Sequence, residues 1–223
     1  MDTVSVFNHN AEDYDRWFDE NPAIYQAELE AVRRFVPLGS RGLEIGVGTG
    51  RFAAPLGVRF GIDPAERPAR IAARRGVEVC VACGEALPFG AGLFDNAVLV
   101  TVDPFVHDLA QVLHEARRVL RPGGRLVVAT LDRDSPLGQA YQAGKDADRF
   151  YRVARFHSAG EIVAAVKAAG FGVTAACQTI LGTPTQSFDT RQVEVAFPPD
   201  AFEVHDGCGR GAFVVVSAEK LVG

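Results

Sequence analysis

Three closely spaced glycines, in the stretch EIGVGTG at 44–50, are the residues best suited by type and spacing to hold a ligand. Gly46, Gly48 and Gly50 allow a sharp backbone turn that a ligand can approach without meeting a Cβ atom. If a helix follows this turn, its first amides favour a carboxylate or a phosphate at the same place. The pattern therefore predicts a binding turn, with a tight turn that holds no ligand as the alternative.

The spacing of these glycines differs from that of a dinucleotide-binding turn. The dinucleotide pattern G-x-G-x-x-G would place its third glycine at position 51, where this chain has Arg51. Here the third glycine stands at position 50, and an acid, Glu44, precedes the first glycine by two residues. A nicotinamide-dependent oxidoreductase is therefore the less favoured enzyme class.

Two further stretches carry polar groups that could complete a nucleoside-binding site. Asp63 ends the next strand-like run, and a carboxylate there can accept hydrogen bonds from both hydroxyls of a ribose. Capping of a helix that begins after Pro64 is the alternative, and the two roles are compatible. One strand further along, Gly84 and Glu85 open a turn that could hold an adenine through backbone contacts.

These residues need a sheet to position them, and each follows a run of apolar and β-branched residues. Such runs predict strands at 41–47, 58–63, 77–82, 96–102 and 125–131. Helical spacing between them predicts a mostly parallel sheet with helices on both faces and ligands at the carboxyl ends of the strands. The last two predicted strands, 172–180 and 212–220, have no helix between them and should pair antiparallel at one edge.

Five motifs, taken in order along the chain, resemble those of the class I S-adenosylmethionine-dependent methyltransferases. The similarity is to the small-molecule enzymes of the methyltransferase type 11 group, and it covers roughly residues 8–180. The motifs are E-x-G-x-G-x-G at 44–50, the acid Asp63, G-E-A-L-P-F at 84–89 where the family has A-E-x-L-P-F, F-D at 94–95 and R-V-L-x-P-G-G at 118–124.

This resemblance implies a fold, a cofactor and a set of site residues. The fold is α/β, a Rossmann-like three-layer αβα sandwich whose seven-stranded sheet is mostly parallel with the last strand antiparallel. The cofactor is S-adenosyl-L-methionine, released as S-adenosyl-L-homocysteine. The resemblance places the methionine portion at the glycine turn with Glu44, the ribose at Asp63 and Pro64, the adenine at Gly84 and Glu85, and the sulfonium end beside Thr101.

We expect a single methyltransferase domain over 1–223, in which residues 1–36 form covering helices and residues 132–157 form a lid-like insertion. The insertion follows the fifth predicted strand and carries several aromatic residues, among them Tyr141 and Tyr151. At that end of the sheet it could enclose an acceptor. A pair of surface helices without substrate contact is the alternative.

The sequence assigns no general base. A base is needed only where the acceptor carries a proton that must leave. Four residues in the expected ligand-end loops could act in this way: Asp103, His107, Asp132 and His157. We therefore assign no catalytic residue.

Composition narrows the partners and the location. The 223 residues are 48% hydrophobic, carry a net charge of −5 and include no apolar run long enough to span a membrane. This mild acidity disfavours nucleic-acid and membrane partners and leaves a small-molecule acceptor, with the cytoplasm as the expected location. Cys80 and Cys83 lack the second pair that a structural zinc site needs, so no metal is expected. The acceptor atom and the oligomeric state stay open, and a non-catalytic S-adenosylmethionine-binding module is the alternative function.

Overall fold

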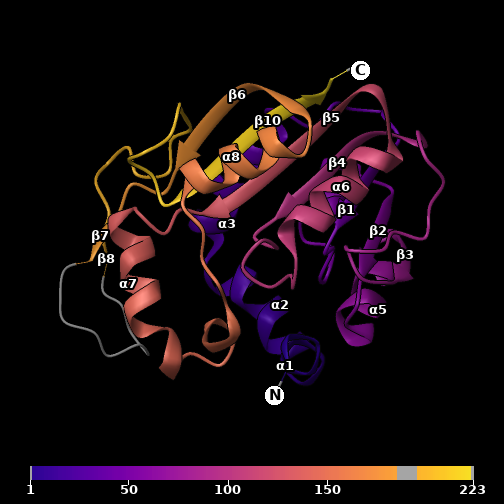
Figure 1. Cartoon of the computed structure of the whole chain (residues 1–223). Helices are drawn as coiled ribbons and strands as arrows, with labels where there is room; N and C mark the ends of the chain where they lie inside the picture. Colours follow the sequence, from indigo (N-terminus) through magenta and orange to yellow (C-terminus); the bar gives the residue numbers. More distant parts are fainter. Residues whose placement is uncertain (1, 185–194, 222–223) are drawn as a thin grey trace.

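One mixed sheet of eight strands forms the centre of the protein in a computed structural model that describes residues 2–184 and 195–221 (Figure 1). The strand order is β3-β2-β1-β4-β5-β10-β6-β9. The strands are β1 (Gly42–Ile45), β2 (Phe60–Asp63), β3 (Glu78–Val81), β4 (Phe94–Val100), β5 (Leu120–Leu131), β6 (Phe171–Thr179), β9 (His205–Asp206) and β10 (Phe213–Lys220). Two short strands, β7 (Thr183–Pro184) and β8 (Val195–Ala196), form a separate two-stranded sheet.

The strands β1 to β5 run parallel, as the alternation of strands and helices predicts. β10 lies between β5 and β6 and is antiparallel to both, with Val215 opposite Ala129 on one side and Cys177 on the other. The antiparallel pairing of the last two predicted strands is therefore confirmed. The α/β class with a mostly parallel sheet is confirmed as well.

The expected number of seven strands is wrong for the described residues, because β9 adds an eighth. The short strand β9 lies along the outer side of β6. His205 and Asp206 then pair with Gln178 and Cys177. This pairing satisfies backbone groups at part of an edge that would otherwise be open. A two-residue strand has too little periodicity to be recognised in a sequence.

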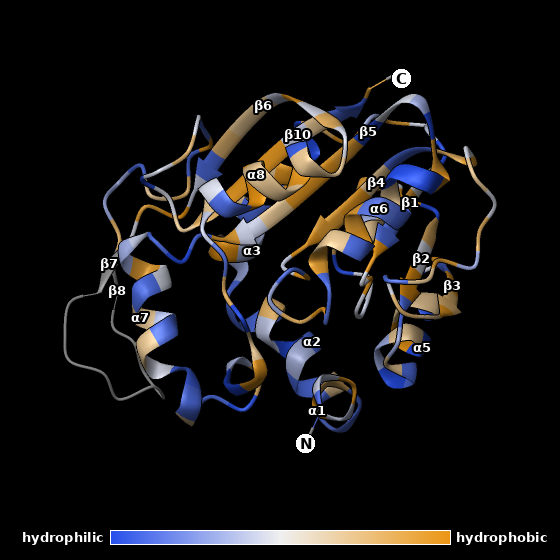
Figure 2. Cartoon of the chain, in the orientation of Figure 1, coloured by the Kyte–Doolittle hydropathy of each residue, from blue (hydrophilic) through white to orange (hydrophobic). Residues whose placement is uncertain are grey.

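Helices cover both faces of the sheet and make three layers (Figure 1). α3 (Pro22–Arg33), α4 (Ala53–Leu56) and α5 (Glu66–Arg74) pack on one face, and α6 (Leu109–Val119) and α8 (Ala159–Ala168) pack on the other. The side chains of β4 alternate accordingly: Val98 and Val100 join the first core, and Ala97 and Leu99 join the second. Figure 2 shows hydrophobic strands between helices of mixed character, which is the pattern of a sheet buried on both faces.

Two further helices precede α3 and lie near the carboxyl ends of the parallel strands (Figure 1). They are α1 (Thr3–His9) and α2 (Ala11–Glu20). The acidic and aromatic stretch 11–20 predicts α2, whereas α1 is too short for its period to be evident. No helix in the described ranges is long and apolar enough to cross a membrane.

Residues 132–157 follow β5 and form α7 (Pro136–Gly144) and two short 3-10 helices, η1 (Lys145–Ala147) and η2 (Tyr151–Val153). The Ser135 hydroxyl accepts a hydrogen bond from the Gly138 amide and caps α7. After this segment, Ser158 and Glu161 form a capping box at the start of α8. Both ends of the segment are thereby fixed to regular structure.

Candidate active site

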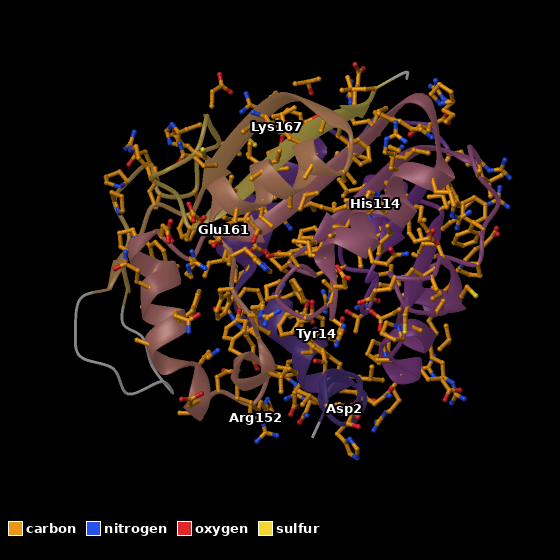
Figure 3. All side chains as sticks on the ribbon, in the orientation of Figure 1. Asp2, Tyr14, His114, Arg152, Glu161 and Lys167 are labelled. Carbon is orange, nitrogen blue, oxygen red and sulfur yellow. The ribbon has the colours of Figure 1, made fainter. Side chains whose placement is uncertain are left out.

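The carboxyl ends of β1, β2 and β4 surround a cavity of about 490 Å³, the first cavity. Its lining includes seven of the residues predicted from the motifs, namely Gly46, Gly48, Asp63, Pro64, Gly84, Glu85 and Thr101. Asp2, at the start of α1, and Tyr14, in α2, also line it, and both are labelled in Figure 3. A volume of this size suits a ligand as large as a nucleoside derivative.

Gly46 and Gly48 line the first cavity in a backbone conformation that other residues rarely adopt. Their φ angles are 76° and 51°. A Cβ on Gly46 would collide with the side chain of Val102, and a Cβ on Gly48 would lie 3.5 Å from the Tyr14 ring. Glycine is therefore needed at position 46 both for the backbone conformation and for lack of space, and at position 48 for the backbone conformation.

Two predicted site residues, Glu44 and Gly50, lie behind the turn and not in the cavity lining. A Cβ on Gly50 would lie 3.0 Å from Ala72 of α5, so this glycine allows the helix to pack against the turn. Glu44 is 2% exposed, and its Oε2 has no hydrogen-bond partner within the described chain. Burial raises the pKa of Glu44 well above its ordinary value, which favours a neutral side chain that supports the turn from below.

Asp63 connects the glycine turn to the start of α5. One carboxylate oxygen accepts a hydrogen bond from the Gly48 amide and the other from the Ala65 amide, each at 2.8 Å. Burial raises the pKa of Asp63, and the two amides oppose this rise. Each oxygen retains a second lone pair that can face the cavity. Asp63 therefore acts as a backbone cap and keeps the capacity to accept hydrogen bonds from a ligand.

Gly84 and Glu85 occupy the side of the cavity that follows β3. A Cβ on Gly84 would lie 3.0 Å from Ile45, so the backbone passes very close to β1. The Glu85 Oε1 atom accepts hydrogen bonds from the amides of His107 and Asp108, at 2.9 and 3.3 Å. The carboxylate thus holds the loop before α6 against this side of the cavity.

Thr101 has strained backbone geometry at the end of β4. Its φ is 49°, and a β-branched residue in the left-handed region is uncommon. Its amide donates to the Ala129 carbonyl at 2.8 Å, which holds the strained residue to β5. Such strain concentrates at functional sites. Thr101 lines both the first cavity and a second one beside it.

The second cavity has a volume of about 280 Å³ and adjoins the first. The two cavities share four lining residues: Phe7, Tyr14, Thr101 and Phe105. Much of the remaining lining of the second cavity is aromatic and comes from α2 and from residues 148–156. Figure 3 labels Tyr14, the shared lining residue that α2 contributes. The two cavities therefore adjoin each other at these four residues.

Arg51 fixes α2 over the glycine turn. Its guanidinium forms ion pairs with Asp15 at 2.8 Å and Asp19 at 2.7 Å. Arg75 of the loop after α5 adds a second ion pair to Asp15 at 2.9 Å. Tyr25 of α3 completes the arrangement by donating a hydrogen bond to the Arg51 carbonyl. The residue that replaces the third glycine of a dinucleotide turn thus anchors the helix over the cavity.

The four possible bases are placed mainly to stabilise loops. His157 Nδ1 lies 3.0 Å from Asp103 Oδ2, and the Thr130 hydroxyl donates to the same oxygen at 2.9 Å. Asp132 accepts hydrogen bonds from the amides of Asp134 and Ala159. His107 lines the first cavity, whereas the other three line neither cavity. This geometry assigns no general base among them.

The sequence predicts covering helices in residues 1–36 but does not show which of their residues line the cavities. α1 supplies Asp2, Thr3, Val4 and Phe7 to the first cavity, and no local pattern indicates this role. α3 supplies Glu28 to the second cavity. A signal for Glu28 does exist, since it lies three residues after Tyr25 and four before Val32, on the apolar face of the helix.

Comparison with known proteins agrees with this arrangement. Residues 43–128 match the family model described as a methyltransferase domain. The chain is 43% identical over 218 residues to an uncharacterized protein of Methanocaldococcus jannaschii, covering 98% of this chain and all of the relative. It is 28% identical over 154 residues to malonyl-[acyl-carrier protein] O-methyltransferase of Methylococcus capsulatus, covering 64% and 56% of the two chains.

A solved structure extends the agreement to the whole fold. It is a crystal structure from Thermotoga maritima, of a protein described as an S-adenosylmethionine-dependent methyltransferase and a possible histamine N-methyltransferase. The two chains are 39% identical and superpose with a TM-score of 0.86 over 97% of this chain and 99% of the other. With the motifs, the sheet and the cavity in agreement, the chain belongs to the class I S-adenosylmethionine-dependent methyltransferases.

Proposed function

We propose that this methyltransferase uses S-adenosylmethionine bound in the first cavity to methylate a small molecule bound in the second. The observation that carries the proposal is the junction of the two cavities at Thr101, Tyr14, Phe7 and Phe105. A second cavity of about 280 Å³ is close to the lower end of the range for small-molecule sites. This size favours a compact acceptor.

The residues of the first cavity fit the cofactor. Gly46 and Gly48 form a turn with φ angles of 76° and 51° that lines the first cavity, and this turn would hold the methionine portion. Asp63 has lone pairs for the ribose hydroxyls, with Pro64 next to it, and Gly84 and Glu85 border the adenine side. Glu44 and Gly50 act behind the turn, through its conformation. When bound, S-adenosylmethionine would supply a methyl group attached to a positively charged sulfur, and the thioether that remains after transfer is a good leaving group.

The chain's own residues contribute mainly by orienting the two ligands and excluding water. Thr101 occupies the junction in a fixed, strained conformation, and the Phe7 and Phe105 rings contact each other there with centroids 5.1 Å apart. Holding two reactants in position can supply up to ~7–11 kcal/mol of the barrier reduction. We assign residues 132–157 as the wall of the acceptor compartment, because Asp148, Phe150, Tyr151 and Phe156 line the second cavity. In this proposal residues 1–223 act as one domain, with α1 and α2 as the cover.

A relative supports a compact acceptor. The Thermotoga protein, described as a possible histamine N-methyltransferase, is 39% identical over nearly the whole chain. Histamine is a small diffusible molecule, which agrees with the size of the second cavity in this chain. A small-molecule partner, without nucleic acid or membrane, is therefore the partner that we propose.

The test is methyl transfer by the purified full-length chain. We expect calorimetry to show binding of S-adenosylhomocysteine and no comparable heat from NADH. Radiolabelled S-adenosylmethionine, incubated with pools of small amines, alcohols, thiols and carboxylic acids, should then label at least one pool. Binding of S-adenosylhomocysteine without labelling of any pool, but with labelling of protein or RNA, would overturn the small-molecule acceptor. Binding with no transfer to any acceptor class would identify a non-catalytic module.

A further inference from the structure

The second cavity contains a buried carboxylate with no partner in the described part of the chain. Glu28 lies on α3, lines the cavity, and is 6% exposed. None of the hydrogen bonds or ion pairs of the described residues involves its carboxylate, and burial alone raises its pKa to about 8. Buried carboxylates are almost always paired, because removing an isolated charge from water is costly. An unpaired one beside a cavity therefore indicates a ligand that completes it.

Two other carboxylates of this lining, those of Asp13 and Asp148, already have partners, and the remaining one, Glu20, is exposed. Asp13 forms ion pairs with Arg149 at 2.6 Å and Arg16 at 2.8 Å. One oxygen of Asp148 accepts hydrogen bonds from the Phe150 and Tyr151 amides at 2.7 Å. Because both cations of the lining, Arg16 and Arg149, are held by Asp13, neither is available to Glu28. No cation among the described residues of this lining is therefore free to pair with Glu28.

Aromatic rings surround the space in front of this carboxylate. Phe7, Tyr14, Trp17, Phe18, Phe52, Phe105, Phe150, Tyr151 and Phe156 line the second cavity. Aromatic faces attract cations, and more strongly where water is excluded. Aromatic rings also pack against apolar groups, so they accommodate a hydrocarbon or ring portion of a ligand. A carboxylate inside an aromatic enclosure is a combination that selects organic cations over neutral or anionic molecules.

We propose that the acceptor is a small organic amine whose ammonium group is bound by Glu28, while another nucleophilic atom of the same molecule, one with a free lone pair, accepts the methyl group. This inference rests on the proposed function, because it names the chemical class of the molecule in the second cavity. The Glu28 carboxylate pairs with the ammonium, and the surrounding rings hold the remainder of the molecule. A carboxylic acid acceptor is disfavoured, because it would bring a second carboxylate to Glu28.

The ionisation of Glu28 gives the proposal a pH signature. The groups that act electrostatically together with Glu28 are Tyr14 of α2, Tyr141 of α7 and Tyr151 of η2, and burial raises the pKa of each, that of Tyr141 to about 12. They stay neutral between pH 6 and 9, so among these groups Glu28 alone titrates there. An amine stays protonated to roughly pH 10, as lysine does. Amine affinity should therefore rise between pH 6 and 8, as Glu28 becomes ionised.

The experiment uses Trp17, the only tryptophan of the chain, as a reporter in the wall of the second cavity. Two ligand sets are titrated at pH 8 into the full chain saturated with S-adenosylhomocysteine. The first is 2-phenylethylamine with 2-phenylethanol and 3-phenylpropanoate, and the second is histamine with 4-(2-hydroxyethyl)imidazole. We expect at least one amine to bind ten times or more tightly than its uncharged counterpart. Its affinity should fall roughly tenfold for each pH unit below 8.

Two variants test the assignment to Glu28. Glu28→Gln keeps the size of the side chain and should remove both the preference for the amine and its pH dependence. Glu30→Gln, on the exposed side of the same helix, is the matched control and should retain both. If no amine is preferred over its uncharged counterpart, or if the preference survives Glu28→Gln, the proposal is wrong. The proposal is also wrong if the acceptor found by methyl transfer has no amine group.

Failure of this inference is separable from failure of the proposed function. Calorimetry with S-adenosylhomocysteine reports on the first cavity alone, and Glu28→Gln should leave that affinity within a few-fold of wild type. Methyl transfer to an alcohol or a thiol, unaffected by Glu28→Gln, would refute the amine and preserve the small-molecule methyltransferase. Absence of transfer to every small molecule would refute the proposed function itself.

Discussion

The two cavities are built in different ways, although they share the junction at Thr101. The first is formed largely by backbone turns after consecutive strands, and its carboxylates, Asp63 and Glu85, accept hydrogen bonds from nearby amides. The second is formed by side chains from α2, α3 and residues 148–156, and its buried carboxylate, Glu28, has no described partner. The carboxylates Asp63 and Glu85 of the first cavity therefore have partners within the protein, whereas Glu28 of the second cavity has an unpaired carboxylate with which a ligand can pair.

The largest expected effect is the loss of cofactor binding in Gly48→Val. A β-branched side chain at a φ of 51° strains the turn and places bulk between it and Tyr14. We expect binding of S-adenosylhomocysteine to weaken by at least ~3 kcal/mol, beyond detection by calorimetry, in a protein that still folds. Gly57→Val is the control, because Gly57 has a φ of 70° but lies outside both cavities. Equal cofactor affinity in the two variants would show that the turn does not contact the ligand.

The next effect concerns stability and belongs to the second cavity. The folded protein keeps the Glu28 proton up to about pH 8, whereas the unfolded chain releases it near the ordinary value of 4.5. Between these values the folded state binds more protons, so its unfolding free energy falls as the pH rises. Relative to Glu28→Gln, wild type should lose up to roughly 1.4 kcal/mol per pH unit between about pH 5 and 8.

Urea denaturation at several pH values measures this difference. Glu30→Gln should show no such trend, because Glu30 is exposed. A constant difference between wild type and Glu28→Gln from pH 5 to 8 would mean that Glu28 ionises normally. Burial of the Glu28 carboxylate would then cost no more free energy than burial of the capped carboxylates of the first cavity.

Asp63→Asn should have an intermediate effect on the first cavity. Loss of a charged acceptor should weaken binding of S-adenosylhomocysteine by ~1–3 kcal/mol. Stability should also fall, since Asp63 accepts amide hydrogen bonds from Gly48 and Ala65. Asp95→Asn is a matched control, because Asp95 likewise accepts an amide hydrogen bond, from Arg41 at 2.8 Å, but lies outside the cavity. If the two variants change the calorimetric affinity for S-adenosylhomocysteine equally, Asp63 only caps the backbone and does not contact the cofactor.

The smallest expected effects are those of the tyrosines in residues 132–157. Tyr151 lines the second cavity, and Tyr141 contacts Tyr151 with ring centroids 5.3 Å apart. Tyr151→Ala should weaken acceptor binding by ~0.5–1.5 kcal/mol beyond the lost buried area, and Tyr141→Ala by less. Both should leave S-adenosylhomocysteine affinity within a few-fold. If either changes cofactor affinity as much as acceptor affinity, the two cavities are not separate compartments.

How far the sequence predicts the molecule depends on how local the interactions are. The parallel strands and the family were predicted, because each depends on short patterns. The same patterns place Gly46, Gly48 and Asp63 at one cavity. They do not show that Glu44 and Gly50 act from behind the turn, which depends on the position of α5. β9 was missed because two residues carry no period of their own.

The sequence by itself determined the parts that depend on short patterns: the glycine turn, the acid at the end of β2 and the parallel strands that carry them. Tertiary structure alone decided the second cavity, because its walls come from α2, α3 and residues 148–156, which are distant along the chain. Glu28 shows the difference most clearly. In the sequence it is one acidic residue on a helix, and it becomes a buried, unpaired carboxylate only when aromatic residues from other elements close around it.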